Sequence, residues 1–264
     1  MASTLNNDHQ LPLGGKLALV TGASRGIGEG IAFELASRGA SVVLAYASPN
    51  SEAKVEALKK RIEALPHRPA AHPVRADLGS IDGPGQIITE LRRWTNGKLF
   101  LDILVNNAGM ERVKSLQEIQ VDDYDAVYKL NVRGIILLTQ AVLPYLRDNA
   151  RIINLGSVGA RAGFKSLSLY CSSKAALEGL TRSWAAELGE NGTTVNCVNP
   201  GPMQSEMLDN IPKEIVDMQK AQTPIQNRLG TIQEVANIVA GLAGRDGAWV
   251  TGQVISASGG WAMY

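Results

Sequence analysis

The sequence has no long apolar run and no block of like charges, and each absence argues against a class of protein. No stretch of about 18 consecutive apolar residues occurs, so we expect no segment that spans a bilayer. The formal net charge is +1 and no five like charges follow one another, which argues against a nucleic-acid partner or a membrane-surface role. The first ten residues, MASTLNNDHQ, lack the apolar core of a signal peptide.

Cysteine and histidine are scarce as well. The two cysteines, Cys171 and Cys197, both fall in segments with regular periodicity, which argues against a secreted disulfide framework and favours a reducing compartment. The three histidines, His9, His67 and His72, form no metal-ligand spacing with these cysteines. We therefore expect a cytoplasmic protein without a metal site.

Short apolar runs alternate with helical stretches along the 264 residues, of which 45% are hydrophobic. This alternation predicts a doubly wound α/β fold, with a seven-stranded, mostly parallel sheet and helices on both faces. Continuous apolar strands agree with burial on both sides. We expect one domain over residues 1–264. The predicted strands lie near 16–20, 41–46, 71–78, 101–109, 150–157, 193–201 and 252–260, and the helices near 27–38, 51–65, 84–95, 121–147, 168–190 and 231–243.

The segment from about 202 to 228 breaks this alternation. It is long, contains Pro212 and Pro224, and carries Met203, Met207 and Met218. A long insertion after the carboxyl end of a strand is a typical place for a substrate lid. A small helical excursion explains the segment equally well, and both interpretations can be true.

A glycine-rich loop, TGASRGIG, follows the first predicted strand and opens the first predicted helix. Its glycines are Gly22, Gly26 and Gly28. Glycine permits tight turns and a close approach of the backbone to a pyrophosphate, which then lies at the N-terminus of the helix. The spacing differs from the commoner G-x-G-x-x-G, and a tight turn without a ligand is the alternative. The position of the loop favours a dinucleotide-binding fold of the Rossmann type.

The segment after the second strand, AYASPN, has no acidic residue that could bind the ribose hydroxyls of NAD. Arg25 lies inside the glycine loop and Ser48 lies near the end of the second strand. Together they could hold a 2′-phosphate, because a guanidinium matches phosphate geometry. The pattern therefore favours NADP over NAD, unless Arg25 is only a solvated loop residue.

Tyr170 precedes Lys174 by four residues in a segment with helical periodicity. Residues four apart share one face of a helix, so a phenol would lie beside an ammonium group. A nearby cation favours the phenolate and lowers the pKa of a tyrosine. Taken alone, the pair is better explained as an ordinary helical side-chain pair.

Six motifs follow one another along the chain: TGASRGIG, NNAG, LNVRG with Asn131, LGSVGA with Ser157, YCSSK with Tyr170 and Lys174, and NPG. In this order they resemble the motifs of the short-chain dehydrogenases/reductases, and the resemblance extends from about Gly15 to Gly260. Three further stretches, VVLAYA, RDGAWVTG and GAWVTGQVI, are similar to those of fungal polyketide ketoreductases of the hydroxynaphthalene and versicolorin type.

The resemblance implies a role for each of four residues. Tyr170 is similar to the acid/base that supplies a proton, and Lys174 to its electrostatic partner, which also reaches the ribose of the nicotinamide. Ser157 resembles the residue that polarises the substrate carbonyl. Asn131 resembles the residue that holds a water on the lysine side of a proton relay. Ser157 also ends a buried strand, where ligands bind in such folds.

The resemblance also implies contacts with an NADPH or NADP⁺ cofactor. Ser258 stands where the family often has aspartate, and Pro49 where close relatives often have a polar residue, so one phosphate contact is in doubt. The implied contacts are Gly22, Ser24, Arg25, Gly26, Ile27, Gly28, Ser48, Asp77, Leu78, Asn107, Ala108, Gly109, Tyr170, Lys174, Pro200, Gly201 and Ser205.

Three functions follow, in decreasing order of support. The first is NADPH-dependent reduction of a ketone, on an aromatic or polycyclic substrate, by a homotetramer. The second is reduction of a 3-oxoacyl chain on an acyl-carrier protein. Lys129 and Arg133, on either side of Asn131, could form the basic patch that such a carrier protein requires. The third is a non-catalytic NADP-binding protein, because a fold alone does not prove an activity.

Overall fold

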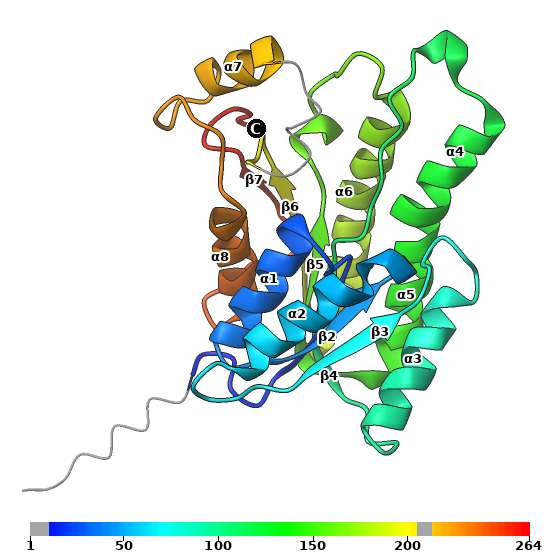
Figure 1. Cartoon of the computed structure of the whole chain (residues 1–264), viewed down its shortest axis with the longest axis vertical. Helices are drawn as coiled ribbons and strands as arrows, with labels where there is room; N and C mark the ends of the chain where they lie inside the picture. The colour runs from blue at the N-terminus through cyan, green and yellow to red at the C-terminus, as the bar shows by residue number, and fades with distance from the viewer. Residues whose placement is uncertain (1–10, 205–212) are drawn as a thin grey trace, which may run out of the picture.

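Seven strands form one sheet in the computed structural model, which describes residues 11–204 and 213–264 (Figure 1). Every neighbouring pair is parallel, and the order is β3-β2-β1-β4-β5-β6-β7. All seven predicted strands are present, so the predicted doubly wound fold is confirmed. The strands are β1 (Leu17–Thr21), β2 (Ser41–Tyr46), β3 (Ala71–Arg75), β4 (Leu101–Asn106), β5 (Leu146–Leu155), β6 (Thr194–Pro200) and β7 (Val254–Ala257).

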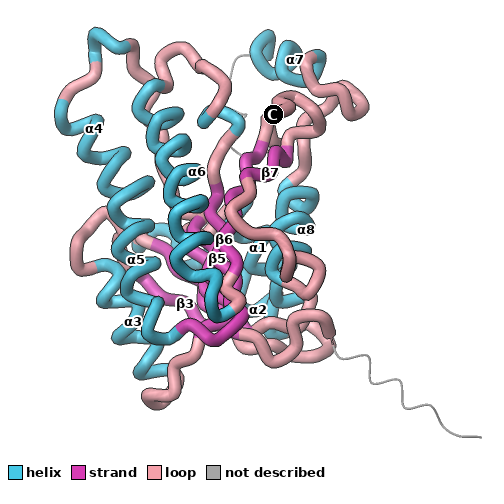
Figure 2. The backbone as a smooth tube through the Cα atoms, turned by 180° about the vertical axis from the view of Figure 1, so that it is seen from behind, coloured by secondary structure: helices cyan, strands magenta, loops and turns pink. Residues whose placement is uncertain are grey.

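Helices cover both faces of this sheet. On one face pack α1 (Gly26–Ser37), α2 (Glu52–Glu63) and α8 (Ile232–Ala243), as Figure 1 shows. On the other lie α3 (Gly83–Trp94), α4 (Val121–Tyr128), α5 (Ile135–Val142) and α6 (Ser168–Leu188), which face the viewer in Figure 2. Side chains of β2 alternate between the two cores, with Val42 in one and Val43 in the other. Burial of both faces explains why the strands read as continuous apolar runs.

The predicted helix at 121–147 differs from the observed structure. A π-helical turn, Lys129–Gly134, separates α4 from α5, and a 3₁₀ turn, Leu143–Tyr145, ends the run. The chain then enters β5 at Leu146, which pairs with Leu101 of β4. Apolar periodicity predicted the helical run but carries no signal for the extra residue that a π turn inserts.

By length and composition alone, the run Val121–Tyr145 could cross a membrane. Core helices of soluble proteins satisfy the same criterion, so this evidence is weak. Here the run is divided into four short elements, and α5 packs against α3 and β4. The fold therefore accounts for its apolar character.

The predicted lid segment contains α7 (Lys213–Ala221), which has no buried residue. Met203 and Gly230, near the two ends of the segment, form an isolated parallel bridge. Met203 also packs against the core beneath α8. Met207 and Pro212 lie outside the described residues.

Candidate active site

The carboxyl ends of the parallel strands place the predicted site residues along one edge of the sheet. Asn106 of β4 pairs with Asn154 of β5, and Asn154 pairs with Cys197 of β6. The chain therefore leaves these three strands at the same level. Ser157 follows β5 by two residues and caps a 3₁₀ turn, Val158–Ala160, by accepting a hydrogen bond from the Gly159 amide at 3.0 Å.

Ser157 and Tyr170 meet at this edge. Tyr170 lies in the first turn of α6, and its side chain lies beside that of Ser157. Burial raises the pKa of Tyr170 above its ordinary value, while the Ser157 hydroxyl, as a hydrogen-bonding neighbour, acts in the opposite direction. The phenol is therefore protonated near neutral pH and has a polar partner for its oxygen.

Lys174 is buried one helical turn further along α6, with 4% of its surface exposed. Its Nζ lies 5.8 Å from the centre of the Tyr170 ring and donates to the Leu155 carbonyl at 2.7 Å. Burial lowers the pKa of Lys174 to about 8, although Cys197 acts in the opposite direction. The predicted proximity of phenol and ammonium is present, but the expected lowering of the Tyr170 pKa is not, because burial of the phenol dominates and the ammonium is directed at the end of β5.

Asn131 projects from the π turn and is fully buried. Its amide exchanges two hydrogen bonds with Met110, accepting from N at 2.9 Å and donating to O at 2.8 Å. It also donates to Ser173 Oγ at 3.0 Å. A Cβ added to Gly109 would lie 3.3 Å from both Asn131 Oδ1 and Lys174 Nζ. Asn131 and Lys174 therefore face the same small space.

The glycine loop is held close to the loop that follows β4. Gly22 has a left-handed φ of +65°, and a Cβ on Gly28 would overlap the Gly22 carbonyl. Asn107 Nδ2 donates to the Thr21 carbonyl at 2.8 Å. Thr21 Oγ1 in turn accepts from the amides of Asn107 and Ala108, at 3.0 and 2.9 Å. Thr21 was not predicted as a site residue; its place inside the TGASRGIG motif was the available signal.

The first turn of α1 fits a phosphate group. Arg25, the N-cap residue, makes no side-chain capping hydrogen bond, so the amides that open α1 have no such partner within the described chain. Such amides, with the helix dipole, attract anions. Arg25 itself is exposed, with Ser24 and Ile27 half-buried beside it. A pyrophosphate is the kind of ligand that this cradle fits.

The remaining predicted cofactor residues that the structure describes occupy the same edge. Ser48 and Asp77 are exposed after β2 and β3, and Leu78 beside Asp77 is buried. Pro200 ends β6, and Gly201 packs so closely on Ser258 that an added Cβ would lie 2.7 Å from its Cα. Ser205 lies outside the described residues.

Two buried residues near Ser157 were not predicted from the sequence. Asn199 Oδ1 accepts from the Ser157 amide at 3.1 Å, and Asn199 Nδ2 donates to Glu178 Oε1 at 2.8 Å. Asn199 belongs to the NPG motif, and Glu178 follows Lys174 by one helical turn. Only these positions in the sequence pointed to the two residues, and neither position predicts that Asn199 contacts Ser157 or Glu178.

A cavity of about 330 Å³ lies apart from these contacts. Its walls come from the ends of the lid segment, α8 and the end of β7, and include Met203, Ile225, Val235 and Ser258. Asn131, Ser157, Tyr170 and Lys174 do not line it. Mutual contacts, rather than this cavity, therefore define the site.

Fold and site together define the class as a doubly wound α/β protein of the dinucleotide-binding type. A family model described as enoyl-(acyl carrier protein) reductase matches residues 22–262. The short-chain dehydrogenase/reductase FrzI of a Cladobotryum species is 41% identical over 252 residues, which cover 93% of this chain and 95% of the relative. The hydroxynaphthalene reductase-like protein Arp2 of Metarhizium brunneum is 38% identical over 94% of this chain and 95% of its own. The chain belongs to the short-chain dehydrogenase/reductase family.

Solved structures agree with this assignment. A short-chain dehydrogenase/reductase from Serratia marcescens matches with a TM-score of 0.88 and 36% identity, over 96% of this chain and 100% of that one. The angucycline C-6 ketoreductase LanV, crystallised with bound NADP, matches with a TM-score of 0.87 and 33% identity, over 94% and 96%. A blue fluorescent protein from a metagenomic library, in complex with NADPH, matches with a TM-score of 0.87 and 36% identity, over 96% and 100%.

The lowered pKa of Lys174 makes stability depend on pH. The unfolded chain holds this proton up to about pH 10.5, whereas the folded chain holds it only to about 8. Stability therefore rises between pH 8 and 10.5, where the unfolded state binds more protons. We expect Lys174→Met to raise the free energy of unfolding by on the order of 2–3 kcal/mol at pH 7, and less as pH approaches 10.5.

Urea unfolding of the cofactor-free protein, followed by circular dichroism at several pH values, measures this difference. The control is Lys165→Met, which makes the same change at an exposed position. A difference between Lys174→Met and the wild type that stays constant from pH 7 to 10 would contradict the assignment.

Proposed function

We propose that the protein reduces a ketone to an alcohol with NADPH. The contact between Tyr170 and Ser157, with Lys174 buried beside them, carries the proposal. Tyr170 donates a proton to the carbonyl oxygen as the alcohol forms, and Ser157 donates a hydrogen bond to that oxygen and orients it. Lys174 stabilises the phenolate that remains after the transfer.

Asn131 holds the proton path behind Tyr170. Its carbonyl oxygen faces the same space as Lys174 Nζ beside Gly109, and we assign it to a water that returns a proton toward the lysine. The amide contacts with Met110 fix its orientation, because Nδ2 must donate and Oδ1 must accept.

The cofactor is assigned to the edge that runs from the glycine loop to Gly109. When bound, the nicotinamide supplies the hydride that reduces the carbonyl carbon. The amides that open α1 would hold the pyrophosphate, and Asp77 with Leu78 would lie near the adenine. Arg25 and Ser48 would hold the 2′-phosphate, which is present in NADPH and absent from NADH. Similarity to LanV, crystallised with NADP, supports this preference.

The proton donor is tested by Tyr170→Phe, which removes the hydroxyl and retains most of the packing. We expect at least a hundredfold loss of kcat, since general acid catalysis contributes about 10²–10⁴-fold. NADPH affinity, measured by fluorescence titration, should stay within about twofold, because the phenol is not the main cofactor contact. Tyr145→Phe is the matched control, and substantial activity in Tyr170→Phe would refute the assignment.

Cofactor choice is tested by Arg25→Ala. Loss of one charge-assisted hydrogen bond, about 1.5–3 kcal/mol, should weaken NADPH binding by roughly ten- to a hundredfold. NADH affinity should change little, because NADH lacks the phosphate. Arg68→Ala, at another exposed arginine, is the control. Equal losses for both cofactors would remove the phosphate role.

An aromatic or polycyclic ketone is the substrate class that the lid segment favours. Three of its apolar side chains are about half exposed: Ile215 at 42%, Met218 at 50% and Ile225 at 54%. These side chains are therefore accessible to a ligand and are not buried by packing within the lid segment. Methionine adapts its shape and contacts aromatic faces favourably. Similarity to hydroxynaphthalene reductase-like proteins points the same way.

Reduction of a carrier-bound 3-oxoacyl chain is the second candidate. The matching family model supports it, because its description names an acyl carrier protein. The two residues expected to form a basic patch for an acyl-carrier protein instead contact groups of this chain. Lys129 pairs with Asp125 at 2.6 Å, and the Arg133 guanidinium bonds the Gly79 carbonyl. This engagement is the reason for ranking the candidate second. The non-catalytic alternative stays third, and the cytoplasmic location remains a prediction from the sequence.

Steady-state kinetics with saturating NADPH separates the two enzymatic candidates. A bicyclic or tricyclic aryl ketone should show kcat/KM at least roughly tenfold above that of a short 3-oxoacyl thioester, because each buried ring adds apolar contact at about 25 cal/mol per Å². Met218→Gln should reduce this preference, while Lys213→Gln on the same helix should leave it unchanged. A preference for the thioester would favour the second candidate.

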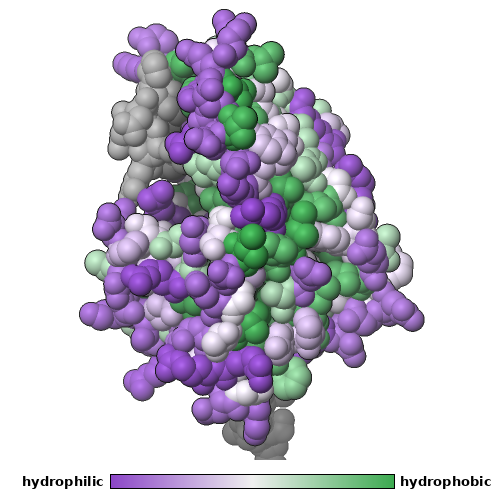
Figure 3. Space-filling view, turned by 90° about the vertical axis from the view of Figure 1, so that its right-hand side faces the viewer, coloured by the Kyte–Doolittle hydropathy of each residue, from purple (hydrophilic) through white to green (hydrophobic). Residues whose placement is uncertain are grey.

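A homotetramer is the assembly that we propose. The face formed by α4–α6 shows a band of apolar surface in Figure 3. Val121, Tyr124, Ile136 and Leu143 on this side are between 37% and 76% exposed. Apolar patches of this kind mark protein–protein interfaces, and closed assemblies with two-fold axes bury them.

Light scattering at micromolar concentration should give four times the chain mass of 28.1 kDa. Ile136→Asp should lower this mass, because it places a charge in the proposed interface. Ile81→Asp, at a residue 69% exposed outside these helices, should leave the mass unchanged. A wild-type monomer would refute the proposal.

A further inference from the structure

A closed ring of polar contacts joins the two ends of the 3₁₀ turn that follows Ser157. At one end, the Ser157 amide donates to Asn199 Oδ1 at 3.1 Å. At the other, Arg161 Nε donates to Glu178 Oε2 at 2.9 Å. Asn199 Nδ2 donates to Glu178 Oε1 at 2.8 Å and completes the ring. The turn is therefore fixed at both ends by residues of α6 and β6.

Asn199 has one possible orientation in this ring. It is fully buried, and its oxygen accepts from the Ser157 amide and from the Cys197 thiol at 3.3 Å. Its nitrogen donates one hydrogen to Glu178 and the other to Tyr264 Oη at 2.7 Å. A flipped amide would face a donor with a donor and the Glu178 carboxylate with an oxygen. Every hydrogen-bonding group of Asn199 is thus in use.

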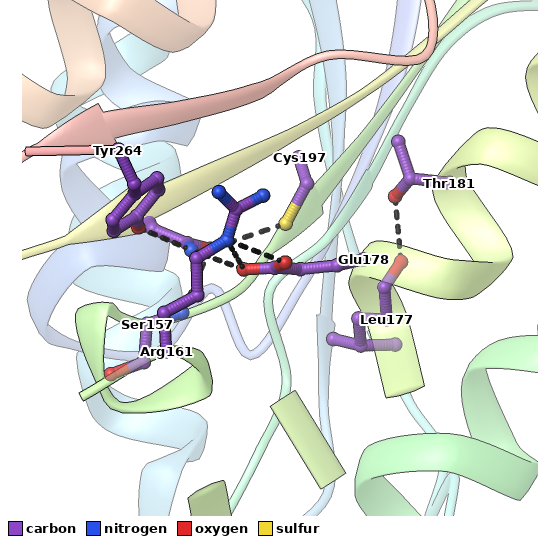
Figure 4. A network of polar contacts seen from close by, with 8 residues as sticks. Ser157, Arg161, Leu177, Glu178, Thr181, Cys197 and Tyr264 are labelled. Atoms are coloured by element: carbon purple, nitrogen blue, oxygen red, sulfur yellow. Dashed lines mark hydrogen bonds and ion pairs between the residues drawn. The ribbon is translucent and has the colours of Figure 1, made fainter. Parts of the chain in front are cut away.

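Tyr264 covers the ring from the solvent side. Its aromatic face lies over the Arg161 guanidinium, with 4.1 Å between Cζ and the ring centre, beside the Glu178 carboxylate (Figure 4). The Glu178 side chain is 8% exposed and that of Arg161 is 37% exposed, so the tyrosine covers an ion pair of which only the carboxylate is buried. The cation–π contact and the ion pair together hold Arg161 between the Tyr264 ring and the Glu178 carboxylate.

The turn after β7 determines where Tyr264 lies. Ser258 Oγ bonds the Ala262 amide at 3.1 Å and Ser256 Oγ at 2.8 Å. Trp261 in the same turn packs on Phe164, with ring centres 5.5 Å apart. Ser258, which stands where the family often has aspartate, therefore holds the segment that carries Tyr264 against the loop after Ser157.

We propose that Asn199 and Tyr264 are positioning residues that hold Ser157 in the orientation needed to contact the substrate oxygen and Tyr170. The catalytic meaning of this inference rests on the proposed function. Displacement of a catalytic group by a fraction of an ångström reduces rate strongly, because the reacting groups lose alignment. Tyr264 is the better position for a test, because its aromatic side chain is partly exposed and its hydroxyl contacts only Asn199 among the residues of this polar network.

Tyr264→Phe tests the positioning directly, because it removes the acceptor of one buried Asn199 hydrogen and keeps the ring over Arg161. Hydrogen–deuterium exchange of peptides covering residues 156–163, in the full protein, reads the amides of Ser157 and Gly159. We expect exchange to be about three- to tenfold faster than in the wild type. Tyr145→Phe, the same change near the opposite edge of the sheet, should leave it unchanged. Unchanged exchange in Tyr264→Phe would overturn the inference.

Kinetics then separates the positioning of Ser157 from the proposed function. With an aryl ketone and NADPH, Tyr264→Phe should lower kcat by about three- to tenfold and leave the KM for NADPH unchanged. A rise in the KM for NADPH at constant kcat would overturn the positioning of Ser157. A wild-type protein that reduces no ketone would refute the proposed function, and the exchange result would still decide whether Tyr264 holds the loop.

Discussion

Parallel pairing of all seven strands brings seven carboxyl ends to one edge of the sheet, and the arrangement of the site depends on it. In the observed register, Asn106, Asn154 and Cys197 stand side by side on β4, β5 and β6. The loops that carry Gly109 and Ser157 therefore leave the sheet at the same level. A slip of one residue in β5 would turn its side chains to the other face and separate Ser157 from Tyr170.

Polar groups replace apolar packing just below this edge. Asn106 donates to Thr139 and to Asn154, and Asn154 donates to Thr181, so one chain of hydrogen bonds links β4 and β5 to α5 and α6. Buried polar groups are costly without partners, so these bonds permit few alternative arrangements, although the Asn106 side-chain oxygen has no hydrogen-bond partner among the described residues. The buried ammonium of Lys174 costs stability in the same place. Its hydrogen bond to the carboxyl end of β5 holds α6 in the alignment that brings Tyr170 to Ser157.

The sequence predicted those parts of the fold that local pattern controls. Strand β2 was predicted at its observed bounds, and the pair Tyr170 and Lys174 was predicted on the correct helix. The π turn that carries Asn131 was not, because one inserted residue leaves apolar periodicity almost unchanged. Nor was the partnership of Asn199 with Tyr264, which are 65 residues apart. Such a contact follows from the packing of β7 and its turn, which no local pattern encodes.

The electrostatics of Tyr170 favour one direction of the proposed reaction near neutral pH. Burial raises its pKa, so the phenol holds a proton at pH 7, the state required of a donor to a carbonyl oxygen. Oxidation of an alcohol needs the phenolate as a base, and the same burial disfavours that state. A hydrogen bond from Ser157 stabilises the phenolate only when the serine is correctly oriented. Lys174, with a pKa of about 8, is charged at pH 7 and can stabilise the anion as it forms. In the proposed reaction, the loop that orients Ser157 would therefore control how readily Tyr170 releases its proton.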